Sequence, residues 1–335
     1  MSAIPAPRFD HVVVYVEDQL DASAETYARL GFHLTERGHH TLGSSNHLAI
    51  FGTDYLELLG YEPARITKDS VLWNMPKGLG GLVFKPGPDA GFRDAIVARG
   101  VPAEPSREFS RPVELPEGTR DASFRVTHLA PEVAFNGRVF FCHHFTPELV
   151  WRPEWQKHAN GVTGIAEFIV ATAEPERAAA PYRKLYGDAA FSPVDGGVAL
   201  QADRGRLLIL TPDAARRHLG DALPPLPVDG RDAMVGLVLR TSSLAQARAA
   251  LQAGGVPVRE EAARLLGAPL PPAVPFEEAW KGMSPMGRGF WAENRRVRSA
   301  ATQAALGLSW RYPSFREGLA AILRAEQAGE GLLQQ

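Results

Sequence analysis

The chain has 335 residues, of which 45% are hydrophobic and 22% are charged, and its net charge is −2 at pH 7. This length allows two domains or one large one, and the composition is ordinary for a soluble globular protein. The small net charge gives no electrostatic footprint for nucleic acid or an anionic membrane surface. The single cysteine, Cys142, excludes an internal disulfide and favours a reducing compartment.

No apolar run approaches the about 20 residues that cross a bilayer. The first ten residues, MSAIPAPRFD, lack the basic-then-apolar pattern of a secretory signal. We therefore expect a cytoplasmic protein that binds neither nucleic acid nor membranes. Exposed strand edges can support a homodimer.

The first segment with a clear period is FDHVVVYVED, residues 9–18. Its valines alternate with His11 and Tyr15, which is typical of a strand with two different faces. We expect the valine face to pack under a helix and His11 and Tyr15 to share the opposite, concave face. The helical segment that follows ends at Gly31, a common stop residue.

The segment DYLELLGY, residues 54–61, alternates in the same way and places Glu57 on a strand face. A carboxylate on a face that looks into a cavity needs a cation or a hydrogen-bond donor, because burial of an unpaired charge is costly. The pattern therefore predicts a partner for Glu57.

The same order of strand and helix recurs along the chain. Opening strands are predicted near Phe9, Leu79, Val162 and Met234, and a helical segment that ends at a glycine follows each of them. Internal repetition is a stronger signal than any single motif. We predict an α+β fold of about four repeated βαβββ modules, followed by a C-terminal helix.

Three motifs carry a resemblance to a known family. They are His11 on the first strand, the GSSN motif that ends at Asn46, and the YLEL segment that contains Glu57. This pattern resembles that of the glyoxalase-like domain proteins of the vicinal oxygen chelate (VOC) superfamily. The HANG segment at His158 is similar to the segment that opens the second half in that family, so the resemblance covers most of residues 9–211.

The resemblance implies that the modules pair into two half-barrels, whose sheets form a cup around a divalent metal ion. Residues 1–157 would then form a module pair with the metal site, residues 158–300 a metal-free pair, and residues 301–335 a helical tail.

The resemblance also implies which residues bind the metal. The first module offers His11 and Glu57, and the last strand of the second module offers His143 and His144. Only one of two neighbouring strand residues can point into the cup, so we expect His11, Glu57 and His144, or His143 in place of His144. Such a set leaves positions open for substrate or dioxygen, and it suits Fe, Mn, Zn or Ni.

A small-molecule pocket needs aromatic walls and a few polar groups. We expect the substrate-binding residues to be Tyr15, Asn46, His47, Glu148 and Trp151. No catalytic acid or base is assigned.

Other interpretations of individual residues are open. Glu57 can form a structural ion pair with an arginine such as Arg125, and a loop position favours solvent exposure for His39 and His40. His128 can contact metal or substrate, although this is the weaker interpretation. Cys142 is expected to be a buried, inert thiol.

We therefore expect a metal-dependent glyoxalase-like enzyme that acts on a small oxygenated molecule. Its chemistry would be of the enolate-type lyase or isomerase class, or a dioxygenase reaction. The alternative is a non-catalytic protein of the bleomycin-resistance type, which binds and sequesters a small molecule.

Overall fold

The computed structural model describes residues 4–66, 71–87 and 91–256, which belong to one compact unit. The rest of the predicted fourth module and the predicted tail at residues 301–335 lie outside the described residues. A domain boundary between residues 157 and 158 stays a prediction. Among the described helices, none is both long and apolar enough to span a membrane.

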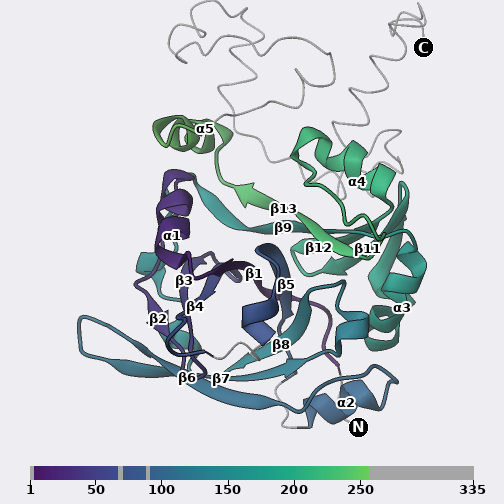
Figure 1. Cartoon of the computed structure of the whole chain (residues 1–335), viewed down its shortest axis with the longest axis horizontal. Helices are drawn as coiled ribbons and strands as arrows, with labels where there is room; N and C mark the ends of the chain where they lie inside the picture. Colours follow the sequence, from purple (N-terminus) through teal and green to yellow (C-terminus); the bar gives the residue numbers. More distant parts are fainter. Residues whose placement is uncertain (1–3, 67–70, 88–90, 257–335) are drawn as a thin grey trace, which may run out of the picture. The chain divides into compact units, whose positions relative to one another are not determined.

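The elements follow the predicted modular order (Figure 1). The first module contains β1 (Phe9–Glu17), α1 (Leu20–Arg29), β2 (Gly38–His39), β3 (Ser44–Ile50) and β4 (Tyr55–Tyr61). The second contains β5 (Gly78–Phe84), α2 (Phe92–Val97), β6 (Arg107–Val113), β7 (Arg120–His128) and β8 (Arg138–His144). The third contains β9 (Val162–Ala171), α3 (Pro175–Tyr186), β10 (Phe191–Val194), β11 (Gly197–Ala202) and β12 (Gly205–Leu210), and α4 (Pro212–Leu219), β13 (Ala233–Thr241) and α5 (Leu244–Ala253) follow. Short 3₁₀ segments lie at Val71–Asn74, Pro131–Val133, Pro147–Leu149, Pro153–Trp155, Asp188–Ala190 and Gly220–Ala222.

The first two modules form a single eight-stranded sheet with the order β2-β3-β4-β1-β5-β8-β7-β6. The antiparallel pairing of β1 with β5 joins the modules, and within each module the first and last strands pair in parallel. The two ends of the sheet approach each other, because the Thr41 amide beside β2 donates to the Ser110 carbonyl of β6 at 3.2 Å. The sheet is therefore curled into a nearly closed cup, as the predicted paired half-barrel fold requires.

A second sheet of five strands has the order β10-β11-β12-β9-β13. The pairing of β9 with β13 is antiparallel, as is that of β1 with β5, so the opening strand of the fourth module repeats the junction of the first two. His158 ties the two sheets together, since its ring donates to the Ile50 carbonyl at 2.8 Å and accepts from the His33 amide at 3.0 Å.

The predicted division of β1 into two faces is confirmed. Val12 and Val16 are buried in a core that also contains Leu20 of α1 and Phe168 of the second sheet. Gly31, at φ +86°, ends α1 as expected. The concave face carries a separate apolar cluster, which lines and supports the interior of the cup.

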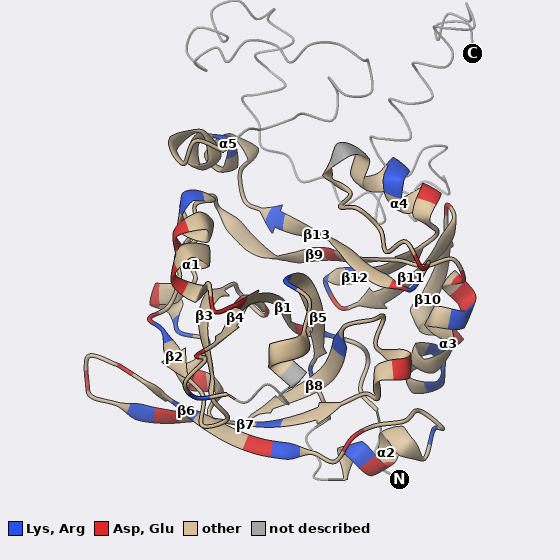
Figure 2. Cartoon of the chain, in the orientation of Figure 1, with Lys and Arg blue, Asp and Glu red and all other residues tan. Residues whose placement is uncertain are grey.

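Charged residues of both signs are interspersed on the outer elements. Figure 2 shows Lys and Arg beside Asp and Glu along α3, α4 and the β6–β7 hairpin. This mixture agrees with the small net charge of the chain.

Candidate functional site

The cup encloses a cavity of about 120 Å³. Leucine, valine and phenylalanine side chains form the apolar part of its wall. Polar side chains also reach it from several strands and from the β2–β3 turn, and they are those of His11, His40, Ser44, Asn46, Tyr55, Glu57, Arg111, His128 and Arg138. A chamber that combines apolar walls with buried polar groups is a common setting of a small-molecule site.

His11 lies between two carboxylates. Its Nδ1 donates to Oδ1 of Asp10 at 2.7 Å, its Nε2 lies 3.5 Å from Oε2 of Glu57, and its ring stacks on Tyr55. Because an ionised carboxylate can only accept, a neutral His11 ring that donates from Nδ1 presents a lone pair at Nε2. Two acceptors that face each other need a proton or a cation between them.

Glu57 is held from its other side by Asn46. The Glu57 side chain is 9% exposed, and its Oε1 accepts from Nδ2 of Asn46 at 2.6 Å. The Asn46 amide also contacts Nε2 of His40 at 3.2 Å. The alternative ion pair with Arg125 does not form, because the Arg125 guanidinium contacts Glu108 at 2.7 Å.

The expectation of solvent exposure is wrong for His40 and correct for His39. The His40 ring is buried against Phe109, and its Nδ1 lies 2.7 Å from the Ser44 hydroxyl, because the β2–β3 hairpin folds it over the cup. Burial lowers the pKa of His40 to about 4, although Glu57 acts in the opposite direction. At neutral pH His40 is therefore an uncharged part of the cavity wall. The His39 side chain is 45% exposed and contacts Glu62.

The two histidines of β8 point to opposite faces. Cys142 lines the cavity and His144 shares its side of the strand, whereas His143 lies with Phe141 beside a small hollow on the other side. Nε2 of His144 donates to Oδ1 of Asp10 at 3.0 Å. Asp10 thus separates the His144 ring from that of His11, whose other nitrogen faces Glu57. The structure brings His11 and Glu57 together but does not bring His144 to Glu57.

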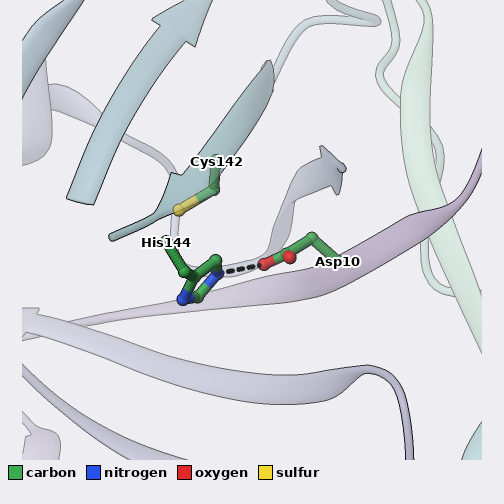
Figure 3. Close-up of side chains that lie close together, drawn as sticks. All are labelled: Asp10, Cys142 and His144. Atoms are coloured by element: carbon green, nitrogen blue, oxygen red, sulfur yellow. Dashed lines mark hydrogen bonds and ion pairs between the residues drawn. The ribbon is translucent and has the colours of Figure 1, made fainter. Parts of the chain in front are cut away.

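Asp10, Cys142 and His144 form a cluster that the sequence analysis did not identify (Figure 3). One potential ligand atom from each residue lies within 4.8 Å of the others. Burial raises the pKa of Asp10, but the charge of His144 and the hydrogen bonds from both histidines outweigh it and hold that pKa well below its usual range. Burial raises the pKa of the Cys142 thiol, which agrees with the expected inert cysteine.

Of the expected substrate-binding residues, only Asn46 lines the cavity. His47 is on the opposite face of β3 from its neighbours Asn46 and Leu48, and its ring contacts the Thr35 carbonyl at 2.8 Å. Strand alternation explains this placement. Glu148 is exposed on the outside and pairs with Arg120 at 3.1 Å.

Tyr15 and Trp151, the two aromatic residues among the expected substrate-binding residues, do not line the cavity. Tyr15 is 3% exposed, and burial raises its pKa to about 12, so its hydroxyl keeps its proton. Trp151 packs on the His144 ring, and the Lys85 ammonium lies 4.1 Å from the Trp151 ring centroid. Both residues support the site and do not line it.

Two arginines also reach the cavity, and neither was identified from the sequence. Arg138 donates to His128, whose pKa is lowered to about 2 by burial and by the charges of Arg138 and Arg107. Arg111 is only 3% exposed, and its Nη2 has no hydrogen-bond partner. Within the part of the chain that the structure describes, no carboxylate lies within 4 Å of the Arg111 guanidinium.

Comparison with known proteins agrees with this architecture. Residues 9–186 match the family model described as a glyoxalase-like domain. A search of curated proteins gave no match.

Solved structures with similarity to this chain include the following three. A hypothetical protein from Staphylococcus aureus is 12% identical over 68% of this chain and 97% of its own length, with a TM-score of 0.48. A mutant 4-hydroxymandelate synthase from Streptomyces coelicolor is 14% identical over 78% and 79% of the two chains, with a TM-score of 0.45. Methylmalonyl-CoA epimerase from Mycobacterium tuberculosis is 19% identical over 42% of this chain and 89% of its own, with a TM-score of 0.31.

Proposed function

The chain belongs to the glyoxalase-like domain family of the VOC superfamily, and on that premise we propose that it is a metal-dependent enzyme acting on a small oxygenated molecule in the cup. His11 and Glu57 would hold a divalent ion at the cavity wall. The observation that carries this proposal is the 3.5 Å approach of Nε2 of His11 to Oε2 of Glu57 in the cavity wall.

The chemistry of these two groups fits such an ion. Two ligand atoms held at about 2.1 Å by one tetrahedral ion are about 3.4 Å apart, which is close to the observed separation. Asp10 supplies the further support that metal-binding histidines usually have, since its carboxylate fixes the ring and the tautomer of His11. His144 stays the predicted third ligand, and it would have to exchange its hydrogen bond with Asp10.

When bound, the ion would polarise neighbouring oxygen atoms of the substrate and stabilise enolate charge. The surrounding side chains have defined tasks. Asn46 orients the Glu57 carboxylate through its amide, while Phe109, Phe124 and Phe140 give the chamber an apolar wall. This setting supports lyase or isomerase chemistry, or dioxygenase chemistry if the ion is iron.

Metal content of purified protein tests the site. We expect near-stoichiometric metal in the wild type, its loss in Glu57→Gln, and no change in Cys142→Ser, which preserves side-chain size. Glu167→Gln, in the third module, is the matched control. If Cys142→Ser loses the metal and Glu57→Gln keeps it, the ion belongs to the Asp10, Cys142 and His144 cluster and the proposed site is wrong. Metal-loaded protein would then be screened with diols, catechols and 2-oxoaldehydes.

The second candidate is a protein that sequesters a small molecule without turnover. It is favoured by one observation: within the described residues, Asp10 stands between His144 and His11, so a complete three-residue set around Glu57 is not assembled. A protein of this kind would bind its ligand equally well after chelator treatment, whereas the enzyme would lose its activity.

A further inference from the structure

The cavity holds a buried cation that the proposed metal site does not use. Arg111 projects from β6, the last strand of the eight-stranded sheet, and its side chain is almost completely excluded from solvent. Arginine keeps its charge in proteins, and a buried charge is costly unless it is paired and hydrogen-bonded. Burial accordingly lowers the pKa of Arg111.

The fold makes room for this guanidinium. Gly38 of β2 lies against it, and a Cβ at that position would fall 2.9 Å from Nη1 of Arg111 and 2.6 Å from Oδ1 of Asn46. β2 and β6 meet where the sheet curls on itself, so the glycine opens the space in which the arginine faces the cavity.

Other arginines of the chain pair with a carboxylate. Arg125, on the neighbouring strand, pairs with Glu108, and Arg217 pairs with Asp195. Arg111 instead has one nitrogen without a hydrogen-bond partner, and the Glu57 carboxylate acts on it only through its charge across the cup. A second guanidinium, that of Arg138, lines the same cavity.

We propose that Arg111 binds the carboxylate of the ligand, and that the substrate class is small monocarboxylates with an apolar, ring-sized body. This inference rests on the proposed small-molecule function of the cup. A planar guanidinium matches a carboxylate with two parallel hydrogen bonds. Leucine, valine and phenylalanine side chains supply apolar surface for the body of such a ligand, and the volume of about 120 Å³ is comparable to that of a cavity that binds benzene, about 150 Å³.

Calorimetric titration with benzoate, and with benzamide as its neutral isostere, tests the inference on the full chain. We expect benzoate to bind the wild type more tightly than benzamide does. Arg111→Gln should weaken benzoate binding about 10- to 100-fold, the range expected for a lost charge-assisted hydrogen bond, and should leave benzamide binding nearly unchanged. Arg125→Gln removes an arginine outside the cavity and should bind both probes as the wild type does.

Arg111→Lys keeps the charge without the planar fork and should fall between wild type and Arg111→Gln. If Arg111→Gln does not fold, Gly38→Ala displaces the guanidinium while its charge remains, and it should weaken benzoate binding in the same direction. Equal affinity for benzoate and benzamide, unchanged benzoate binding in the folded variant, or no benzoate binding by the wild type would overturn the inference.

Metal analysis of the same samples separates this inference from the proposed function. Metal that is retained by Arg111→Gln together with a failed benzoate test leaves the metalloenzyme proposal in place and removes the carboxylate subsite. A wild type without metal that still binds benzoate through Arg111 removes the metalloenzyme and keeps the subsite.

Discussion

Glu167 in the third module and Glu57 in the first are both nearly buried, but they have different partners. Glu167 of β9 contacts the Arg206 guanidinium of β12 and accepts from Nε2 of His218 at 2.7 Å. Glu57 of β4 has a neutral amide on one side and Nε2 of His11 on the other. Both side chains are nearly buried, at 13% and 9% exposure. The chain thus provides an arginine for Glu167, whereas among the described residues no arginine or lysine pairs with Glu57.

This contrast shows two ways in which one fold accommodates a buried carboxylate. Burial raises the pKa of Glu167, but the hydrogen bonds from His218 and Arg206 outweigh it and hold the pKa at about 2. Arg111 is the basic counterpart of Glu57, a buried charge whose partner is not supplied by the described chain. Buried charges of this kind inside a cavity are the groups to which our two proposals assign a ligand.

The largest expected effect is the loss of stability in the Glu167→Gln variant. Glu167→Gln removes the carboxylate that the Arg206 guanidinium and the His218 ring contact, and we expect it to lower the free energy of unfolding by about 2 kcal/mol. Glu57→Gln should change the stability of the metal-free protein by less than about 1 kcal/mol, because no ion pair with an arginine is lost. Urea denaturation measures both. A larger loss in Glu57→Gln than in Glu167→Gln would reverse the comparison.

The contacts of Glu167 should also make the free energy of unfolding depend on pH. The pKa of Glu167 in the folded protein, about 2, is below its ordinary value of 4.5, so its stabilisation is complete above pH 4.5 and is lost as the pH falls toward 2. The stability difference between the wild type and Glu167→Gln should therefore shrink over that window. Burial raises the pKa of Asp54 to about 6, so this group destabilises the fold as the pH rises. Because both proteins contain Asp54, its effect cancels in the difference between them. A difference that stays constant down to pH 2 would show that the ion pairs do not stabilise the fold.

Asp10→Asn tests whether the Asp10 carboxylate positions His11 for metal binding. The amide introduced by this substitution would keep one acceptor but lose the charge that both histidines contact, so metal affinity should fall about 10- to 100-fold. Competition with a chromogenic chelator measures this affinity, and Asp213→Asn on α4, whose carboxylate pairs with exposed Arg216, serves as the control. Equal metal affinity of wild type and Asp10→Asn would mean that the carboxylate does not position a metal ligand.

The smallest expected effect is the gain in stability in the Arg111→Met variant. Replacement of a buried, unpaired charge by an apolar side chain of similar length removes a cost, so Arg111→Met should stabilise the ligand-free protein by about 1 kcal/mol. Arg125→Met breaks only an exposed pair and should stay within about 0.5 kcal/mol. Thermal unfolding of the two variants checks the difference. Strong destabilisation of Arg111→Met alone would assign Arg111 a structural role.

The sequence predicted the fold and half of the site, and the reasons are physical. His11 and Glu57 lie on alternating strands, where a two-residue period fixes the face. Asp10 escaped detection because strict alternation turns it away from His11. A register shift between Phe9 and His11 in the pairing with β5 lets the neighbouring side chains meet.

His40 and Arg111 escaped detection for a different reason. Both depend on closure of the sheet, which brings the β2–β3 turn over β6. Contacts between elements so distant in sequence have no local period. A local signal for Arg111 was its position two residues from both Phe109 and Val113, which places a charge between two apolar residues on one strand face.

The most direct test of the central claim is the position of the ion itself. Crystals of the protein loaded with Zn²⁺ or Mn²⁺, measured at the absorption edge of that metal, give an anomalous peak wherever the ion binds. The account predicts a peak in contact with both Nε2 of His11 and the Glu57 carboxylate. A peak among Asp10, Cys142 and His144, or a loaded crystal without a peak in the cup, would contradict it.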